Sequence, residues 1–161
     1  MTYAHATDSI VEVAAPAEAL FDCLDDQARL GAHMEKPSAM MVGGRMTYQF
    51  DQAQGRAVGA VIRMDGNILW LKLFVEEVVV EHNRPVRKTW ETRGRPNLLV
   101  IGAYRMGFEI EPAGSRQRLR VYINYDHPAS RVGRVLAWLF AGAYARWCVT
   151  RMTDEALRRF S

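Results

Sequence analysis

The sequence predicts an α+β fold, in which a curved seven-stranded antiparallel sheet wraps around one long C-terminal helix. Three observations support this expectation. Alternating polar and apolar residues recur in short runs from about residue 40 to residue 127. A helical pattern then continues from Ser130 to about Phe160, and two short helical patterns follow the first strand. The length suits one domain over residues 1–161, large enough to bury a core.

The N-terminal elements are a strand and two short helices. The strand is expected from about Ala6 to Val13, where β-branched residues are frequent. Pro16 suits the first turn of a helix, because the N–H that proline lacks has no partner there. The segment AEALFDCLDD continues this helix with one apolar face. Asp25 is expected to end it and to cap a second short helix in DDQARLGAH.

Six strand-like runs follow, and the short connections between them favour an antiparallel meander with one covered face and one wet face. In MMVGGRMTYQF the alternation places Met46, Tyr48 and Phe50 on one side. Asp65-Gly66-Asn67 has the composition of a hairpin turn. In the last two runs the expected inward rows are Tyr104, Met106, Phe108 and Ile110, then Leu119, Val121, Ile123 and Tyr125.

The start of the C-terminal helix is unusually apolar. The segment RVLAWLFAGAYARW, from Arg134 to Trp147, has apolar residues on nearly every side. A membrane span needs roughly 20 apolar residues, so this segment is too short to be one. It should instead be covered by protein on more than one side. The sequence leaves open whether it is an ordinary core helix or one wall of a cavity for an apolar ligand.

The net charge and the N-terminal segment give limited information about partners and location. The net charge of +3 is small, and the arginines are spread along the chain. No recognition helix or zinc signature is found, so a nucleic-acid partner is not expected. Weak attraction to an acidic partner or to an anionic membrane surface stays open. The start MTYAHATDSI lacks the features of a secretory signal, which predicts a cytoplasmic location. The sequence does not indicate an oligomeric state.

Known metal, cofactor and nucleophile motifs are not found in the sequence. None of the four histidines has ligand spacing with a second His or Cys, so no metal is expected. No glycine-rich phosphate loop and no G-x-S-x-G string occur, so no cofactor is expected either. Cys23 and Cys148 lie in separate apolar helical patterns and are interpreted as buried thiols.

The sequence resembles the START-like superfamily, also described as the Bet v 1-like or polyketide cyclase/dehydrase and lipid-transport group. The resemblance covers essentially the whole chain. It is carried by the segments IVEVAAPAEALFDCLDD, GRAVGAVIRMDG and VRKTWE, together with the C-terminal helix. These are packing and turn features, so they indicate fold more strongly than function. The resemblance implies a helix-grip fold with an apolar cavity between the sheet and the long helix.

Within such a cavity the inward strand rows and the apolar helix would face the ligand. Buried tyrosine and tryptophan side chains carry one polar atom each, which can orient a ligand in an otherwise apolar pocket. The predicted ligand-binding residues are Tyr48, Trp90, Tyr104, Met106, Phe108, Ile123, Tyr125, Leu136, Leu139, Phe140 and Ala143.

Three functions are compatible with these features. The preferred hypothesis is binding or carriage of a small hydrophobic molecule, such as a lipid, a sterol-like compound or a polyketide. The alternative is an enzyme similar to polyketide aromatase/cyclases, with Tyr104, Tyr125 and Arg63 as candidate catalytic residues. The register of the strands leaves the directions of Arg63 and Lys72 open, and no inward carboxylate is evident. A third hypothesis is a protein-interaction module, as in co-chaperone relatives of the fold.

Overall fold

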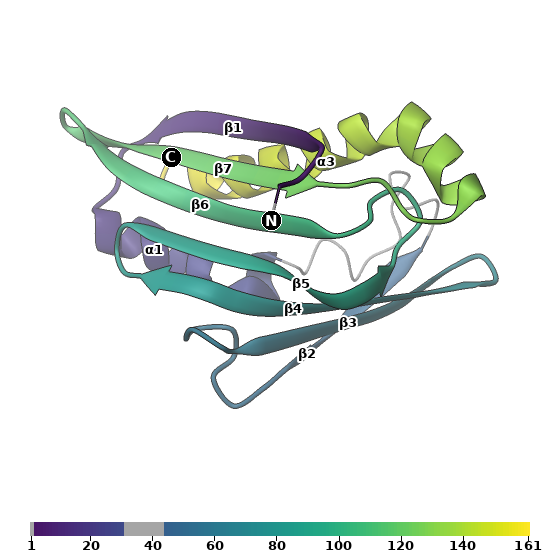
Figure 1. Ribbon diagram of the computed structural model, residues 1–161. Helices are drawn as coiled ribbons and strands as arrows, with labels where there is room; N and C mark the ends of the chain where they lie inside the picture. The colour runs from purple at the N-terminus through teal and green to yellow at the C-terminus, as the bar shows by residue number, and fades with distance from the viewer. Residues whose placement is uncertain (1, 31–43) are drawn as a thin grey trace.

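The fold is that of one curved antiparallel sheet holding a long helix (Figure 1), as the sequence predicts. The computed structural model describes residues 2–30 and 44–161. Within them the elements, in chain order, are β1 (His5–Val13), α1 (Ala17–Asp25), β2 (Arg45–Phe50), β3 (Val61–Ile68), β4 (Leu71–Asn83), β5 (Arg87–Asn97), β6 (Tyr104–Ala113), β7 (Arg116–Tyr125) and α3 (Arg131–Arg159).

The sheet is antiparallel throughout, with strand order β1-β7-β6-β5-β4-β3-β2. Strands β2 to β7 are a meander, and β1 pairs with the last strand of that meander. The pairing between β4 and β5 shifts register near Glu76 and again near Val79. Irregularities of this kind bend a strand and increase the local twist. Curvature of the sheet therefore increases in the half of the molecule that contains β4.

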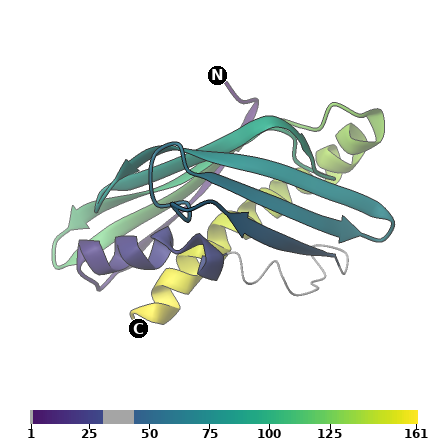
Figure 2. The same ribbon diagram turned by 90° about the horizontal axis from the view of Figure 1, so that it is seen from below.

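Helix α3 crosses the inner face of the sheet on one side of it. It packs against β1 and β7, and its C-terminal half also meets α1 (Figure 2). The contact row is Ala137, Ala141, Ala145 and Val149, spaced four residues apart on one helix face and all nearly inaccessible. These small side chains let the helix lie close to the sheet. Ser130 caps the helix by accepting a hydrogen bond from the Gly133 N–H at 3.0 Å.

The predicted hairpin turn at Asp65-Gly66-Asn67 is wrong. These residues continue β3, in which Gly66 pairs with Met46 on one side and Leu73 on the other. The chain reverses at Leu69 and Trp70 instead, and Leu69 takes the left-handed conformation with φ of 53°. Gly66 is required for a different reason, because a Cβ there would clash with the Arg45 carbonyl and the Met46 sulfur.

Two predicted elements extend beyond the described residues. Residues 27–30 are helical, in agreement with a second short helix after β1, but residues 31–33 of DDQARLGAH lie outside the described part. Residues 40–43 of the strand run MMVGGRMTYQF also lie outside it, and β2 begins at Arg45.

The expectation that protein covers the apolar start of α3 is also wrong. The segment carries five large exposed side chains, which are Val132, Val135, Trp138, Leu139 and Phe140. The alanine row takes up the side that faces the sheet, so the larger apolar residues lie on the other sides of the helix. The apolar character of this segment is therefore only partly explained by the core.

Candidate functional site

An apolar cavity of about 470 Å³ lies between the sheet and α3. It forms because α3 packs on β1 and β7, while strands β2 to β5 curve away from the helix. Volumes of this order are typical of sites for small organic ligands. Among the lining residues are four methionines, Met46, Met64, Met106 and Met152, whose flexible thioethers adapt to ligands of different shape. The remaining wall is mostly aliphatic and aromatic.

Eight of the eleven predicted ligand-binding residues line this cavity. They are Tyr48, Trp90, Tyr104, Met106, Ile123, Leu136, Phe140 and Ala143. The strand residues among them lie on the inward rows that alternation predicts, and the helix residues lie on the side of α3 beside the alanine row. Period-two and period-3.6 patterns therefore locate part of the cavity wall.

The other three predicted residues do not line the cavity. Phe108 is completely buried between Phe21 and Trp90, so α1 covers it. Tyr125 is buried between β7 and α3, with its hydroxyl 4.0 Å from the Cβ position of Gly142. Leu139 lies on the outer side of the helix and is 55% exposed. Alternation predicts the direction of each side chain, but not which neighbour covers it.

Arg63 and Lys72 point away from the cavity. Arg63 is exposed on the outer face of the sheet, and its Nε donates a hydrogen bond to Glu76 across the β3–β4 pair at 2.7 Å. Lys72 is exposed as well. The inward side of β3 carries Ile62, Met64 and Ile68. Arg63 therefore cannot act on a molecule in the cavity, which excludes it as a catalytic residue there.

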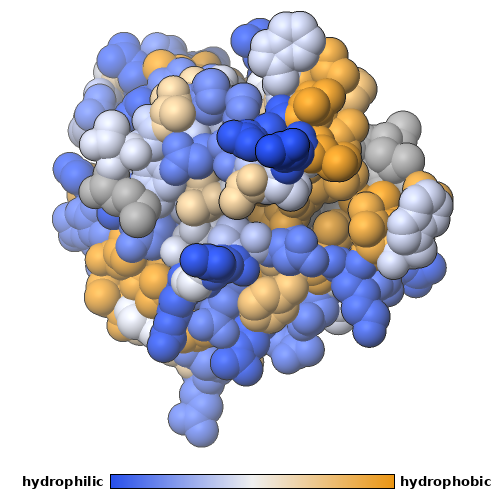
Figure 3. Space-filling model, turned by 45° about the vertical axis from the view of Figure 1, so that its right-hand side comes forward, coloured by the Kyte–Doolittle hydropathy of each residue, from blue (hydrophilic) through white to orange (hydrophobic). Residues whose placement is uncertain are grey.

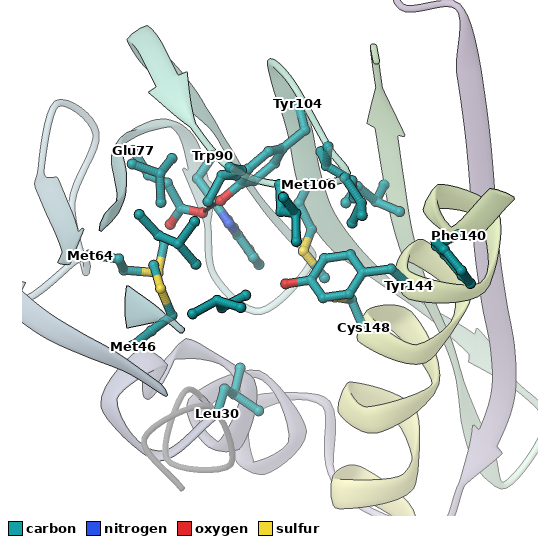
Figure 4. A pocket seen from close by; sticks show the side chains of 18 of the residues that line it. Leu30, Met46, Met64, Glu77, Trp90, Tyr104, Met106, Phe140, Tyr144 and Cys148 are labelled. Atoms are coloured by element: carbon teal, nitrogen blue, oxygen red, sulfur yellow. Dashed lines mark hydrogen bonds between the residues drawn. The ribbon is translucent and has the colours of Figure 1, made fainter. Parts of the chain in front are cut away.

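The polar end of the cavity is formed by Glu77, Tyr104 and Trp90 (Figure 4). Glu77 is 4% exposed, and its carboxyl group accepts a short hydrogen bond from the Tyr104 hydroxyl and another from the Trp90 side chain. Burial raises the pKa of Glu77 from its usual 4.5 to about 7, although both hydrogen bonds and the positive charge of Lys88 oppose the rise. Glu77 thus exchanges its proton near neutral pH in an apolar site.

Tyr144 and Cys148 form a second polar pair on the helix wall. The Tyr144 hydroxyl points into the cavity (Figure 4) and is hydrogen-bonded to the Cys148 thiol. Burial raises the pKa of Cys148 to about 12, and it raises the pKa of Tyr144 well above 10. Both groups are therefore neutral at physiological pH. They can donate or accept hydrogen bonds, and the thiol is unsuited to act as a nucleophile.

A buried ion pair lies between β5 and α1. Lys88 is completely inaccessible, and its Nζ donates to Asp25 Oδ1 at 2.6 Å and to Gln27 Oε1 at 3.2 Å. Asp25 Oδ2 also lies 3.0 Å from the His82 ring. Desolvation lowers the pKa of Lys88, and the hydrogen bond to Asp25 opposes that change. The pair anchors α1 to the sheet and places a positive charge behind Glu77.

Glu77 is the charged cavity residue that the sequence analysis misses. Its neighbours Val75 and Val79 point inward, so alternation alone places Glu77 on the inner face. This carboxylate is not among the site residues predicted from the sequence. Adjacent Glu76 and Glu77 point to opposite faces of the strand, so the two cannot act together as an acid–base pair on one substrate. Lys88 is missed in the same way, since it shares the inward row of Trp90. Both residues can be recognised in the sequence, because each is a charged residue at an inward position of a strand whose other inward residues are apolar.

Residues 2–30 and 44–161 show neither a metal site nor a membrane-spanning helix. No group of three or more His, Cys, Asp or Glu side chains in that part is arranged to hold a metal ion. No helix in the described part is long and apolar enough to span a membrane.

Solved structures show the same fold at low sequence identity. The protein TTHA0849 from Thermus thermophilus superposes with a TM-score of 0.68 at 13% identity, covering 97% of each chain. Ginseng major latex-like protein 151 from Panax ginseng gives 0.63 at 8% identity, again over 97% of each chain. Norcoclaurine synthase from Thalictrum flavum, solved with dopamine and hydroxybenzaldehyde, gives 0.64 at 13% identity over 96% of this chain and 84% of that one.

The sequence comparisons agree with this fold. No curated protein matches the chain significantly. The family model for polyketide cyclase/dehydrase and lipid transport matches residues 4–161, which is nearly the whole chain. With its seven-stranded sheet, long C-terminal helix and apolar cavity between them, the chain belongs to the polyketide cyclase/dehydrase and lipid transport family and has a Bet v 1-like fold.

Proposed function

We propose that this protein binds a small, largely apolar molecule that carries a hydrogen-bonding group at one end. The observation that supports this most is the cavity itself, an apolar space of about 470 Å³ with only a few polar side chains in its wall. Each Å² of apolar ligand surface removed from water contributes about 25 cal/mol before the costs of ordering the ligand. The family typically binds hydrophobic ligands, in agreement with this proposal.

The polar groups set the expected chemistry of the ligand. Glu77 already accepts hydrogen bonds from Tyr104 and Trp90, and a carboxylate has room for more donors. A ligand hydroxyl or N–H therefore fits at Glu77. The Tyr144 hydroxyl lies on the opposite wall and suits a ligand carbonyl or hydroxyl. We expect a lipid, sterol-like or polyketide-like molecule with an oxygen or nitrogen at the end that reaches Glu77.

Native mass spectrometry of freshly purified protein tests this proposal. A mass excess that disappears on denaturation would reveal a co-purifying ligand, and fragmentation would identify its class. The proposal predicts an apolar compound with at least one hydroxyl, carbonyl or N–H group. A purely ionic or highly polar ligand in the cavity would contradict it. So would a ligand-free protein that binds no member of a panel of fatty acids, sterols and polyketides.

A second candidate function is cyclisation of a poly-ketone chain, and Glu77 beside Tyr104 favours it. As a carboxylate, Glu77 would take a proton from a CH₂ group between two carbonyls, which leaves an enolate. The enolate carbon would attack another carbonyl of the chain to form a C–C bond. Protonated Glu77 would then return its proton to the new alkoxide. Tyr104 would orient Glu77 through the hydrogen bond between them.

Two variants separate this enzyme from a carrier. Glu77→Gln retains shape and hydrogen bonding but cannot accept the proton, so turnover of a poly-ketone substrate would fall by at least about a hundredfold. Binding of the same substrate would stay within a fewfold of the wild-type value. Tyr104→Phe would shift the pH profile of turnover, because Glu77 loses a donor that lowers its pKa. Wild-type protein that binds such substrates without converting them would rule the enzyme out.

A further inference from the structure

Two exposed apolar projections stand at one end of the molecule. The first is the start of α3, with Val132, Val135, Trp138 and Leu139, and the second is the tip of the β3–β4 hairpin, with Leu69 and Trp70. We refer to these six residues as the apolar rim. Trp138 is 79% exposed and Trp70 is 84% exposed. Large aromatic side chains are seldom so exposed without a partner, and exposed apolar side chains that gather at one end of a molecule often mark an interaction site.

The two projections point the same way and flank the cavity. The hairpin tip and the start of α3 reach the same end of the molecule in both ribbon views (Figures 1 and 2). Apolar side chains gather over this end in the space-filling view (Figure 3). Leu136 and Phe140 lie within the same helical turns as the rim residues and line the cavity. The rim is thus continuous with the wall of the ligand site.

The charges around the rim are positive. The first turns of α3 carry Arg131 and Arg134, and no carboxylate occurs between Asp126 and Asp154. Lys72 adds a cation beside the hairpin tip. Within the described residues, no ion pair involves any of these three.

Some arginines on the outer face of the sheet are paired with carboxylates, whereas others, such as Arg116 and Arg118, are in no ion pair within the described residues. Arg63 is paired with Glu76, Arg105 with Glu91, and Arg120 with both Asp8 and Glu109. What distinguishes the rim is that its cations, Arg131, Arg134 and Lys72, stand beside exposed apolar side chains. The combination of apolar side chains and positive charge favours an anionic partner for the rim.

A lipid surface fits these features better than a folded protein does. Tryptophan prefers the boundary between lipid headgroups and acyl chains, and arginine extends its charge to the headgroups while its stem stays in apolar surroundings. The rim consists of two separate projections beside a cavity opening. Two projections can enter a soft interface together, whereas a protein partner would need a matching shape for each.

We propose that the apolar rim docks this protein on an anionic membrane surface, with the ligand cavity facing the bilayer. Apolar residues and tryptophans would enter the headgroup region, and the arginines and Lys72 would contact lipid phosphates. An apolar ligand could then move between bilayer and cavity without crossing water. That exchange step rests on the proposed ligand binding, whereas the docking itself does not.

Co-sedimentation with vesicles tests the docking. Wild-type protein would bind vesicles of phosphatidylcholine with about 30% phosphatidylglycerol, and would bind at least about tenfold more weakly to pure phosphatidylcholine. The variant Trp70→Ala/Trp138→Ala would lose at least about tenfold in affinity for the anionic vesicles. The control Ile10→Ala/Val58→Ala removes apolar side chains that are also exposed but belong to other elements, and it would bind like the wild type. Thermal unfolding would verify that both variants are folded.

The possible outcomes distinguish a failure of the docking proposal from a failure of the ligand-binding proposal. Absence of binding to anionic vesicles, or equal binding by the tryptophan variant, would overturn the docking proposal even if the cavity takes ligand. A concentration-dependent dimer that the tryptophan variant abolishes would assign the rim to a second copy of the chain and overturn it too. Ala143→Phe would fill the cavity from the helix side and should leave docking unchanged. Absence of ligand binding by the wild-type protein would overturn only the proposed movement of ligand between bilayer and cavity, and would leave the docking proposal standing.

Discussion

At the scale of single residues, Glu77 determines how the site responds to pH. Its carboxyl group is buried among Tyr104, Trp90 and apolar side chains, and its pKa is raised to about 7. The folded protein therefore holds this proton more tightly than the unfolded chain does. The extra stability is complete below the unfolded pKa of about 4.5, and it is lost as the pH rises through about 7.

The first prediction is that unfolding free energy falls by about 3 kcal/mol between about pH 4.5 and pH 8 because Glu77 ionises. Glu77→Gln removes the titrating group, so its stability should vary less with pH and should exceed that of the wild type at the alkaline end. Urea unfolding of both proteins across this pH range measures the difference between their unfolding free energies. The contributions of the other titrating groups are the same in both proteins and cancel in this difference. Parallel curves for the two proteins would show that Glu77 is ionised in a wetter site.

The second prediction concerns Lys88, which has its charge buried beside Asp25. Lys88→Met would leave the Asp25 carboxylate with His82 as its remaining partner and should cost about 3 kcal/mol of unfolding free energy. The control is Arg84→Ala, which breaks the exposed pair with Asp22 and should change stability far less. Chemical denaturation of the two variants and the wild type measures these changes in unfolding free energy. Equal effects of the two substitutions would mean that Lys88 is not needed to hold α1.

At the scale of elements, α3 combines three different faces in one helix. The alanine row packs on the sheet, a second side lines the cavity, and the third is exposed as part of the apolar rim. This division explains why RVLAWLFAGAYARW is apolar nearly all round. A hydrophobicity pattern cannot separate the three sides, because each of them selects apolar residues.

The third prediction distinguishes two of these faces with neighbouring alanines. Ala145 is completely buried against the sheet, so Ala145→Leu should overpack the interface and cost about 1–3 kcal/mol of stability. Ala143 lines the cavity, so Ala143→Leu should leave stability nearly unchanged and weaken ligand binding. Thermal unfolding and ligand titration of both variants measure these effects. Similar losses of stability in the two variants would contradict the assignment of faces.

At the scale of the whole molecule, the sequence predicts the fold and part of the cavity wall. Strand alternation and the long helical pattern are repeated over many residues, so the architecture survives local errors such as the misplaced turn at Asp65-Gly66-Asn67. The polar end of the cavity is harder to predict. A single charged residue such as Glu77 or Lys88 is buried only because residues distant in sequence close around it.

The fourth prediction follows from ligand binding to the folded state. A ligand at about a hundred times its dissociation constant raises the unfolding free energy by about 2.7 kcal/mol. For a chain of this size, that corresponds to a rise in melting temperature of roughly 5–10 °C. A thermal-shift screen of apolar compounds with one hydroxyl or N–H group should therefore find stabilising ligands. Stabilisation by polar anions alone would contradict the expected ligand class.

The most direct test of the central claim, that the cavity binds an apolar ligand, is fluorescence titration with N-phenyl-1-naphthylamine. This neutral dye is apolar and has one N–H group, so it should bind in a 1:1 ratio. Ala143→Phe should weaken binding at least about tenfold by filling the cavity, whereas Ala113→Phe adds the same group at the distant β6–β7 hairpin and should have little effect. Equal binding by both variants, or no saturable binding by the wild type, would contradict the claim.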